Sequence, residues 1–276
     1  MTFPTTLDIR PFLEEDIGTG DLTAAIVPGT VTAEAEVVTR EPMVVCGQAW
    51  FTAVFNELGP AVRIGWLCAE GEAVKAGAVL CRLAGPARAL LTGERTALNL
   101  LQTLSATATV ARQYAEAVAG TGCKVLDTRK TIPGLRQAQK YAVTVGGCYN
   151  HRLGLYDGVL IKENHITAAG SITGAVRLAR ELTTAPVEVE VETLEQLREA
   201  LAAAPDRIML DNFGLDDLRA AVRIAGGRVE LEASGNIGLG NIRTIAETGV
   251  DYISIGALTK HVKAADLSMR IKLARG

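Results

Sequence analysis

The alternation of strand-like and helix-like segments after Gly122 is the feature that most constrains the fold of this chain. Six short segments rich in Val, Ile and Leu are predicted strands, and stretches with apolar residues at helical spacing fill most of the intervals between them. The predicted strands are Lys124–Asp127, Gly158–Lys162, Pro186–Glu192, Arg207–Asp211, Val229–Ser234 and Tyr252–Gly256. Such a series builds a parallel α/β fold. Because six to seven strands fall short of eight, we predict an incomplete α/β barrel, with an open doubly wound sheet as the second candidate.

The chain before this series follows a different pattern. Residues 31–47 and 61–85 alternate apolar and polar side chains between glycine turns, as antiparallel strands do. Residues 93–120 then carry apolar side chains every three or four positions, which predicts a long helix. We therefore predict an N-terminal α+β domain of the open-faced sandwich type.

The two patterns set the expected domain boundary inside the predicted long helix. We assign residues 1–107 to the N-terminal α+β domain and residues 108–261 to the α/β-barrel domain. Residues 262–276 are amphipathic, and we predict that they form a C-terminal helix that packs back on one of the two domains.

Composition excludes several other classes of protein. A mean hydropathy of +0.21 with 48% hydrophobic residues excludes a disordered chain. No uncharged apolar stretch reaches the ~18 residues that a membrane helix needs, and the N-terminus lacks the basic start and apolar run of a signal peptide. The five cysteines are an odd number without a C-x-x-C pair, which argues against a zinc knuckle and for a reducing compartment. We expect a cytoplasmic protein without a membrane partner.

Positive charge is concentrated in one segment. The chain has a net charge of −3, yet the segment from Lys124 to Lys162 holds seven Lys and Arg residues and only two Asp residues. A nucleic-acid-binding protein would normally be basic over a whole domain. This segment is short and mixed with glycine, so we expect a small polyanion as ligand and no nucleic acid.

Side chains capable of chemistry stand at or near the ends of three successive predicted strands. They are Lys162, Glu190 and Asp211. The carboxyl ends of parallel strands are where α/β folds place their sites. Alternate residues of Pro186–Glu192 share a face, so we expect its valines to meet the helices and its glutamates to point into the barrel. The alternative is a solvated edge strand with three outward glutamates. Buried carboxylates need partners, and Lys162, Arg129 and Lys130 are the available cations.

Two glycine-bearing turns follow the last two predicted strands. The first contains Ser234, Gly235 and Asn236, and the second contains Ile255, Gly256 and Ala257. Backbone N–H groups in such turns, together with a helix N-terminus, bind phosphate. The order of the two turns predicts a phosphate monoester as part of the ligand.

Two cationic pairs lie on separate predicted loops. Arg129 is followed by Lys130, and His151 is followed by Arg152. A guanidinium group grips a carboxylate with two parallel hydrogen bonds, so two such pairs match a ligand with two carboxylates. The alternative for His151 is a helix cap or a buried structural imidazole.

In order and spacing, these segments resemble the signature of quinolinate phosphoribosyltransferases. The matching pieces are DTRKT (127–131), PGLR (133–136), KYAV (140–143), NHR (150–152), EVEVE (188–192), LDNF (210–213), SGNI (234–237), GALT (256–259) and the N-terminal GERTALN (93–99). The resemblance covers nearly the whole chain. It implies an α/β N-terminal domain plus an incomplete barrel, and a head-to-tail homodimer, alone or within a hexamer, in which Arg95 reaches into the partner's site.

The resemblance also implies the reaction and the residues that perform it. The family transfers phosphoribosyl from phosphoribosyl diphosphate to quinolinate with decarboxylation, giving nicotinate mononucleotide. The implied quinolinate-binding residues are Arg95, Thr128, Arg129, Lys130, His151 and Arg152. The implied residues for phosphoribosyl diphosphate are Lys162, Glu190, Asp211 and the two glycine-bearing turns. Lys162, Glu190 and Asp211 are the implied catalytic residues, and Glu190 and Asp211 would hold the cofactor Mg²⁺ through water.

Three other functions stay open at this point. A relative of the molybdenum-transport type, or one acting on another pyridine carboxylate, would keep the fold and change the ligand, and Cys148-Tyr149 could narrow the pocket. A Schiff-base lyase would use Lys162 as its nucleophile. A lipoyl- or biotinyl-carrier module would use the turn in residues 70–85, but Lys75 lacks the expected setting there.

Overall fold

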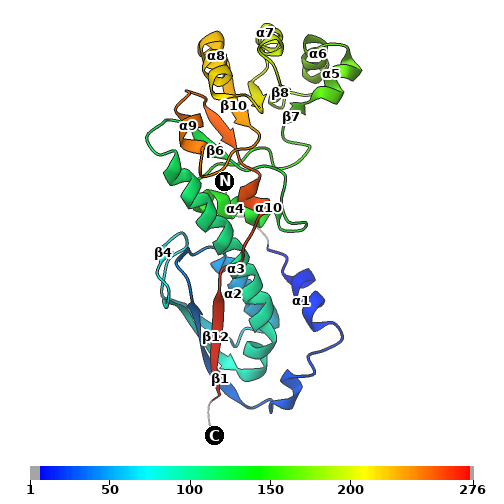
Figure 1. Cartoon of the computed structure of the whole chain (residues 1–276). Coiled ribbons are helices and arrows are strands. Elements are labelled where there is room, and N and C mark those ends of the chain that lie inside the picture. The colour runs from blue at the N-terminus through cyan, green and yellow to red at the C-terminus, as the bar shows by residue number, and fades with distance from the viewer. Residues whose placement is uncertain (1–6, 274–276) are drawn as a thin grey trace. The chain divides into compact units, whose positions relative to one another are not determined.

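The computed structural model describes residues 7–273 and divides into two compact units (Figure 1). The first unit contains the chain up to residue 111, residues 137–146 and the chain from residue 261 onward, and the second contains residues 112–136 and 147–260. The division falls inside the long helix α3 (Ala87–Ala117). Helix α4 (Arg136–Val145) groups mainly with the first unit although its flanking segments belong to the second.

The first unit is built on a four-stranded antiparallel sheet in the order β12-β1-β5-β3. Its strands are β1 (Thr32–Thr39), β3 (Arg63–Trp66), β5 (Val79–Pro86) and β12 (Leu267–Leu273). A two-stranded ribbon, the helices and a 3₁₀ turn complete the unit: β2 (Met43–Val44), β4 (Ala73–Val74), α1 (Arg10–Ile17), Ala24–Ile26, α2 (Gln48–Leu58), α3 and α4. This arrangement of helices and one antiparallel sheet is the predicted α+β class.

The prediction of a C-terminal helix is wrong. Residues Leu267–Leu273 form the edge strand β12, which pairs antiparallel with residues 33–39 of β1. Leu267 and Met269 are buried and Arg270 is exposed, so the side chains alternate with a period of two. The apolar spacing of this segment therefore fits a strand better than a helix. Residues 274–276 lie outside the described part of the chain.

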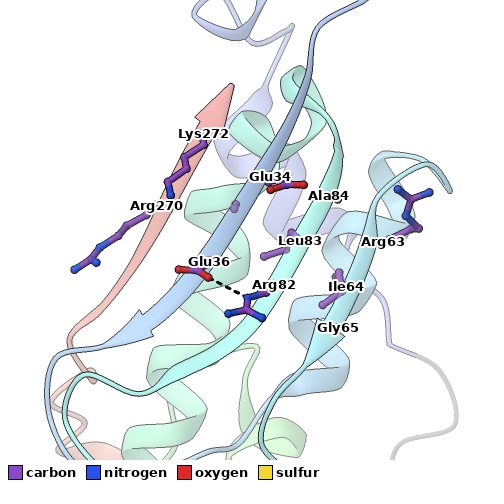
Figure 2. A pocket seen from close by; sticks show the side chains of 11 residues that line it. Glu34, Glu36, Arg63, Ile64, Gly65, Arg82, Leu83, Ala84, Arg270 and Lys272 are labelled. Carbon is purple, nitrogen blue, oxygen red and sulfur yellow. Dashed lines mark hydrogen bonds and ion pairs between the residues drawn. The ribbon is translucent and has the colours of Figure 1, made fainter. Parts of the chain in front are cut away.

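The two faces of the four-stranded sheet differ in polarity. Ala33, Ala35 and Val37 of β1 are buried, while Glu34 and Glu36 between them point to the opposite face (Figure 2). That outer face forms a shallow hollow of about 470 Å³ with a charged lining, and it contains the ion pair between Arg82 Nε and Glu36 Oε1 at 3.0 Å. The outer face is therefore solvated, and the core of the unit lies on the side of Val37.

The second unit contains a six-stranded parallel sheet in the order β6-β11-β10-β9-β8-β7. Its strands are β6 (Lys124–Leu126), β7 (Val159–Ile161), β8 (Val187–Val191), β9 (Arg207–Asp211), β10 (Glu230–Ser234) and β11 (Tyr252–Ser254). Each lies within one of the six predicted segments, so the predicted parallel α/β fold is confirmed. A bridge between Leu126 and Tyr149 adds a seventh segment beside β6.

The helices of this unit follow the strands in alternation. They are α5 (Glu163–Ala169), α6 (Ile172–Leu182), α7 (Leu194–Ala203), α8 (Leu215–Ala225), α9 (Ile242–Ala246) and α10 (Ala257–Lys260). Helices α6 and α7 contact β8 (Figure 1). The valines of β8 at 187, 189 and 191 have no exposed surface. The predicted separation of valines from glutamates along β8 is confirmed. Within residues 7–273, no helix combines the length and hydropathy that a membrane crossing needs.

Leu101 on α3 tests the core of the first unit. The side chain is fully buried, so we expect Leu101→Ala to lower the free energy of unfolding by about 2–5 kcal/mol, because the change removes apolar contacts and leaves a cavity. Urea denaturation measures the loss. Asn99→Ala on the exposed side of the same helix is the control, with an expected change within about 0.5 kcal/mol. Equal losses in both variants would contradict the burial of Leu101.

Candidate active site

The register of the parallel strands stacks charged side chains in layers on one face of the sheet. Glu188 on β8 lies opposite Arg207 on β9, and Arg207 lies opposite Glu230 on β10. Two residues further along, Glu190 and Glu232 flank Met209 in the same way. At the carboxyl ends, Asp211 is paired with Ser234. The strands therefore bring acids from β8, β9 and β10 to one face; the alternation in the sequence predicts this for the glutamates of β8 alone.

Lys162 and Glu190 form an ion pair at the carboxyl ends of neighbouring strands. The Lys162 Nζ is bonded to Glu190 Oε2, and the Glu190 side chain is only 10% exposed. Lys162 is one of the three cations that the sequence analysis names as available partners for buried carboxylates. Since an ammonium group bound to a carboxylate is a poor nucleophile, the pair argues against the Schiff-base lyase.

Asp211 ends β9, and hydrogen bonds connect the residue that follows it to the segment that follows β10. Its Oδ2 accepts a hydrogen bond from Asn212 Nδ2 at 2.7 Å, and the Asn212 backbone N–H donates to the Ser234 carbonyl at 2.9 Å. Asn212 Oδ1 accepts from Asn236 Nδ2 at 3.2 Å. The turn also contains Gly235, with φ +92°, and left-handed conformations at Asn212 and Asn236. The first glycine-bearing turn is thus held against the end of the neighbouring strand.

The second glycine-bearing turn lies against the loop that follows β6. The Ile255 N–H donates to the Leu126 carbonyl at 2.8 Å, and a β-carbon on Gly256 would lie 3.1 Å from Lys130 Cδ and 3.6 Å from Thr128 Oγ1. The hydroxyl of Thr259 in α10 donates to the Lys130 carbonyl at 2.8 Å. The structure therefore brings Thr128 and Lys130 to the predicted phosphate turn around Ile255, Gly256 and Ala257.

Asp127 anchors the loop that carries His151. Its carboxylate is fully buried; Oδ1 accepts from the His151 backbone N–H at 2.9 Å and Oδ2 from Asn150 Nδ2 at 2.5 Å. The Tyr149 N–H donates to the Val125 carbonyl at 2.8 Å. The second predicted cationic pair, His151 and Arg152, is therefore fixed to the end of β6, from which the first pair also starts.

The two arginines of the cationic pairs are close enough to repel each other. Burial and the charge of Arg129 lower the pKa of Arg152. The Arg152 Nη1 donates to the Gly158 carbonyl at 3.0 Å, while the buried Arg129 Nε has no hydrogen-bond partner among the described residues. Two neighbouring guanidinium groups with a donor to spare form a ready site for an anion. A cavity of about 360 Å³ borders Arg152 and His151.

The His151 ring lies close to two buried carboxylates, those of Glu188 and Glu232. Its Nε2 lies 2.7 Å from Glu188 Oε2 and 3.7 Å from Glu232 Oε2, and Glu232 is fully buried. Burial lowers the pKa of His151, but the hydrogen bond to Glu188 and the nearby carboxylates outweigh it, so the pKa lies above its usual value. A proton on Nδ1 would displace the Arg152 N–H that bonds there at 2.7 Å, which opposes this rise. Burial, reinforced by Glu188, raises the pKa of Glu232.

Arg95 lies outside this group. It is an exposed residue of α3, in the part of that helix that belongs to the first unit. The other predicted site residues, from Thr128 to Ala257, all belong to the second unit.

Several residues of the site escaped the sequence analysis. The sequence analysis includes Asn212 only within the LDNF motif (210–213), although Asn tolerates the left-handed conformation of turns. Glu232 and Arg207 looked like ordinary members of alternating strands. Only the register, which pairs β8, β9 and β10, shows that they face Glu188 and His151.

The described residues contain one group of three potential metal ligands, His151, Glu188 and Glu232, whose ligand atoms lie within 4.8 Å of one another. This group differs from the predicted metal residues, Glu190 and Asp211. Arg207 and the His151 ring already bond to its carboxylates.

Comparison with known proteins now assigns the family. Residues 21–105 match the N-terminal domain of quinolinate phosphoribosyl transferase, and residues 107–270 match its C-terminal domain. The chain belongs to the quinolinate phosphoribosyl transferase family.

Relatives of this family match over almost their whole length. The chain is 45% identical over 268 residues to a probable nicotinate-nucleotide pyrophosphorylase [carboxylating] of Bacillus subtilis, covering 96% of this chain and 93% of the relative. It is 44% identical to the nicotinate-nucleotide pyrophosphorylase [carboxylating] of Mycobacterium leprae, with 95% of each chain covered. The solved nicotinate-nucleotide pyrophosphorylase of Francisella tularensis superposes with a TM-score of 0.92 at 49% identity, covering 96% of this chain and 94% of that one.

Substitution of Gly235 tests the turn that follows β10 and bonds to Asn212 at the end of β9. A β-carbon there would collide with the Asn212 side chain, lying 2.6 Å from its Cγ, and the φ of +92° disfavours any side chain. We expect Gly235→Ala to lower the free energy of unfolding by about 1–3 kcal/mol in urea denaturation. Gly240→Ala, in the same loop but with no atom within 4 Å, is the matched control. Equal stability of the two variants would contradict the described turn.

Proposed function

We propose that this chain transfers the phosphoribosyl group of phosphoribosyl diphosphate to quinolinate, with loss of carbon dioxide, and releases nicotinate mononucleotide and diphosphate. Membership of the quinolinate phosphoribosyl transferase family supports this reaction. The observation that carries it is the pair of neighbouring arginines, Arg129 and Arg152, on the same unit as the Lys162–Glu190 ion pair. The two arginines suit the carboxylates of a dicarboxylate ligand. The lysine suits the negative charge of a departing diphosphate, and the glutamate suits the positive charge that grows on the ribose.

The cationic residues would bind quinolinate. Arg129 and Arg152 supply guanidinium groups for its carboxylates, Lys130 supplies a point charge, and Thr128 supplies a hydroxyl. His151 would act at the edge of this group, since both of its ring nitrogens already have partners. Arg95 would enter from the second protomer of a homodimer; its exposure on α3 is compatible with such a contact. We place this homodimer in the cytoplasm.

The strand ends would bind phosphoribosyl diphosphate. The 5′-phosphate would lie on the N–H groups of the two glycine-bearing turns, and Glu190 and Asp211 would bind the ribose hydroxyls. Their carboxylate oxygens, on adjacent strands and partly exposed, also suit Mg²⁺ bound through water. When bound, Mg²⁺ would neutralise diphosphate charge.

Positioning and electrostatics would carry the catalysis. As the bond between C1 of the ribose and the diphosphate oxygen breaks, positive charge grows on the ribose, and Glu190 and Asp211 stabilise it. Lys162 offsets negative charge on the leaving group. The ring nitrogen then bonds to C1, and the resulting pyridinium cation stabilises the carbanion that remains when carbon dioxide leaves the adjacent carbon. This carbanion takes a proton from water, which gives nicotinate mononucleotide. No protein nucleophile is required.

The reaction is tested by incubating the protein with quinolinate, phosphoribosyl diphosphate and Mg²⁺. We expect carbon dioxide and nicotinate mononucleotide in equal amounts. A parallel incubation with nicotinate tests whether both carboxylates are required, and we expect little turnover. Turnover of nicotinate without turnover of quinolinate would instead favour a transferase for another pyridine carboxylate.

Arg152→Ala tests the binding of quinolinate. Because the change removes a charged donor beside Arg129, we expect the KM for quinolinate to rise strongly, corresponding to about 2–5 kcal/mol, with a smaller effect on the KM for phosphoribosyl diphosphate. Steady-state kinetics measure both constants. The exposed Arg223→Ala on α8 is the control and should behave as the wild type. An unchanged KM in Arg152→Ala would remove this residue from the site.

Lys162→Ala tests the leaving-group charge. We expect kcat to fall by about 10²–10³-fold, since a donor acting on developing charge contributes mainly in the transition state, while the KM for quinolinate changes little. Lys260→Ala, an exposed lysine at the end of α10, is the control. A wild-type kcat in Lys162→Ala would refute this role.

A further inference from the structure

The His151 ring is held at both nitrogens, which fixes its orientation and its tautomer. Nδ1 accepts a hydrogen bond from the Arg152 backbone N–H at 2.7 Å, so it carries a lone pair, and the proton on Nε2 points to Glu188 Oε2 at 2.7 Å. The His151 backbone N–H is bonded to Asp127 at 2.9 Å. A movement of the ring would therefore also move the Arg152 main chain.

A second carboxylate near this ring, that of Glu232, is bonded to Arg207. Arg207 Nη1 donates to Glu232 Oε2 at 3.2 Å, and the Arg207 guanidinium lies 3.9 Å from the centre of the Tyr252 ring. Glu232 Oε2 lies 3.7 Å from His151 Nε2, and its side chain has no exposed surface. The chain of contacts thus runs from Tyr252 through Arg207 and Glu232 to His151.

The stability of the fold does not by itself favour this chain of contacts. One oxygen each of Glu188 and Glu232 is buried without a hydrogen-bond partner in the described part of the chain, as is Arg207 Nε. Unpaired buried polar groups destabilise a fold, and well-packed apolar residues often stabilise it as much as a buried ion pair does. A requirement of the adjoining site explains why charged side chains occupy these places.

We propose that Glu188, Glu232 and Arg207 form a positioning network that orients His151 and, through the bond from its ring to the Arg152 amide, sets the Arg152 guanidinium for the dicarboxylate. Glu232 and Arg207 act through other residues and touch no substrate. The proposal rests on the proposed function, because the ligand it serves is quinolinate. It also accounts for the three potential metal ligands without a second metal ion, since their close approach is the support of His151.

Glu232→Gln is the decisive variant, and Glu230→Gln is its matched control. Both glutamates lie near Arg207, but Glu230 is half exposed, at 3.5 Å from Arg207, whereas Glu232 is fully buried, at 3.2 Å from Arg207 and 3.7 Å from His151 Nε2. We expect Glu232→Gln to raise the KM for quinolinate about tenfold, because small displacements of binding groups have large effects, and to leave the KM for phosphoribosyl diphosphate within about twofold. Glu230→Gln should leave both constants unchanged.

A second measurement determines the protonation state of the His151 ring in the absence of substrate. The chain has three histidines, so the ¹⁵N signals of His151 can be assigned by comparison with His151→Gln. In the wild type we expect the neutral ring to be protonated on Nε2 alone. In Glu232→Gln we expect the ¹⁵N signals of His151 to move, because the negative charge 3.7 Å from Nε2 is lost, and in Glu230→Gln we expect the wild-type pattern.

The outcomes separate this inference from the proposed function. If the wild type does not convert quinolinate, the proposed function is wrong and the dicarboxylate role of the network falls with it. If the wild type converts quinolinate while Glu232→Gln keeps its KM and its ring signals, the proposed function stands and the network is refuted. An equal rise of both KM values would also refute it, because it would indicate a general loss of structure. Should Glu232→Gln fail to fold, Glu188→Gln replaces it, with the same expected split between the two constants.

Discussion

Charge compensation on one face of the parallel sheet is the constraint on which the rest of the second unit depends. A strand whose valines face the helices has to place its glutamates on the other side, and each of these acids then requires a cation nearby. Glu190 pairs with Lys162, which follows the neighbouring strand. Glu188 bonds to the His151 ring and lies opposite Arg207 in the sheet. The site is therefore a consequence of how β8 is buried as much as of the loops around it.

The loops are attached to this charged face at a small number of points. Asp127 holds the loop of His151 and Arg152 at the end of β6, and Asn212 holds the glycine turn at the end of β10. In both cases a short polar side chain at a strand end bonds directly to the segment that carries ligand-binding groups. Such anchors keep a binding site on rigid elements even though its residues come from loops.

Most of the fold and the outline of the site can be predicted from the sequence. The predictions were incomplete or wrong where the pairing of strands determines which residues are neighbours. The six parallel strands, the buried valines of β8 and the partnership of Lys162 with Glu190 follow from local patterns and from the rule that buried acids need cations. Arg207 and Glu232 were missed because their roles depend on register, which a single sequence does not show. The amphipathic pattern of residues 262–276 predicts a helix, whereas residues 267–273 form a strand because they pair with β1.

The edge position of β12 brings together segments that lie far apart in the sequence. Ala33 is paired with Leu273, so the four-stranded sheet contains β1 and, at its border, the last described residues. The second unit lies between β5 and β12 in the sequence, so during synthesis β1 keeps an open hydrogen-bonding edge until residues 267–273 have been made. The N-terminal sheet is therefore completed only after the second unit has been synthesised, and β12 then covers the open edge of β1.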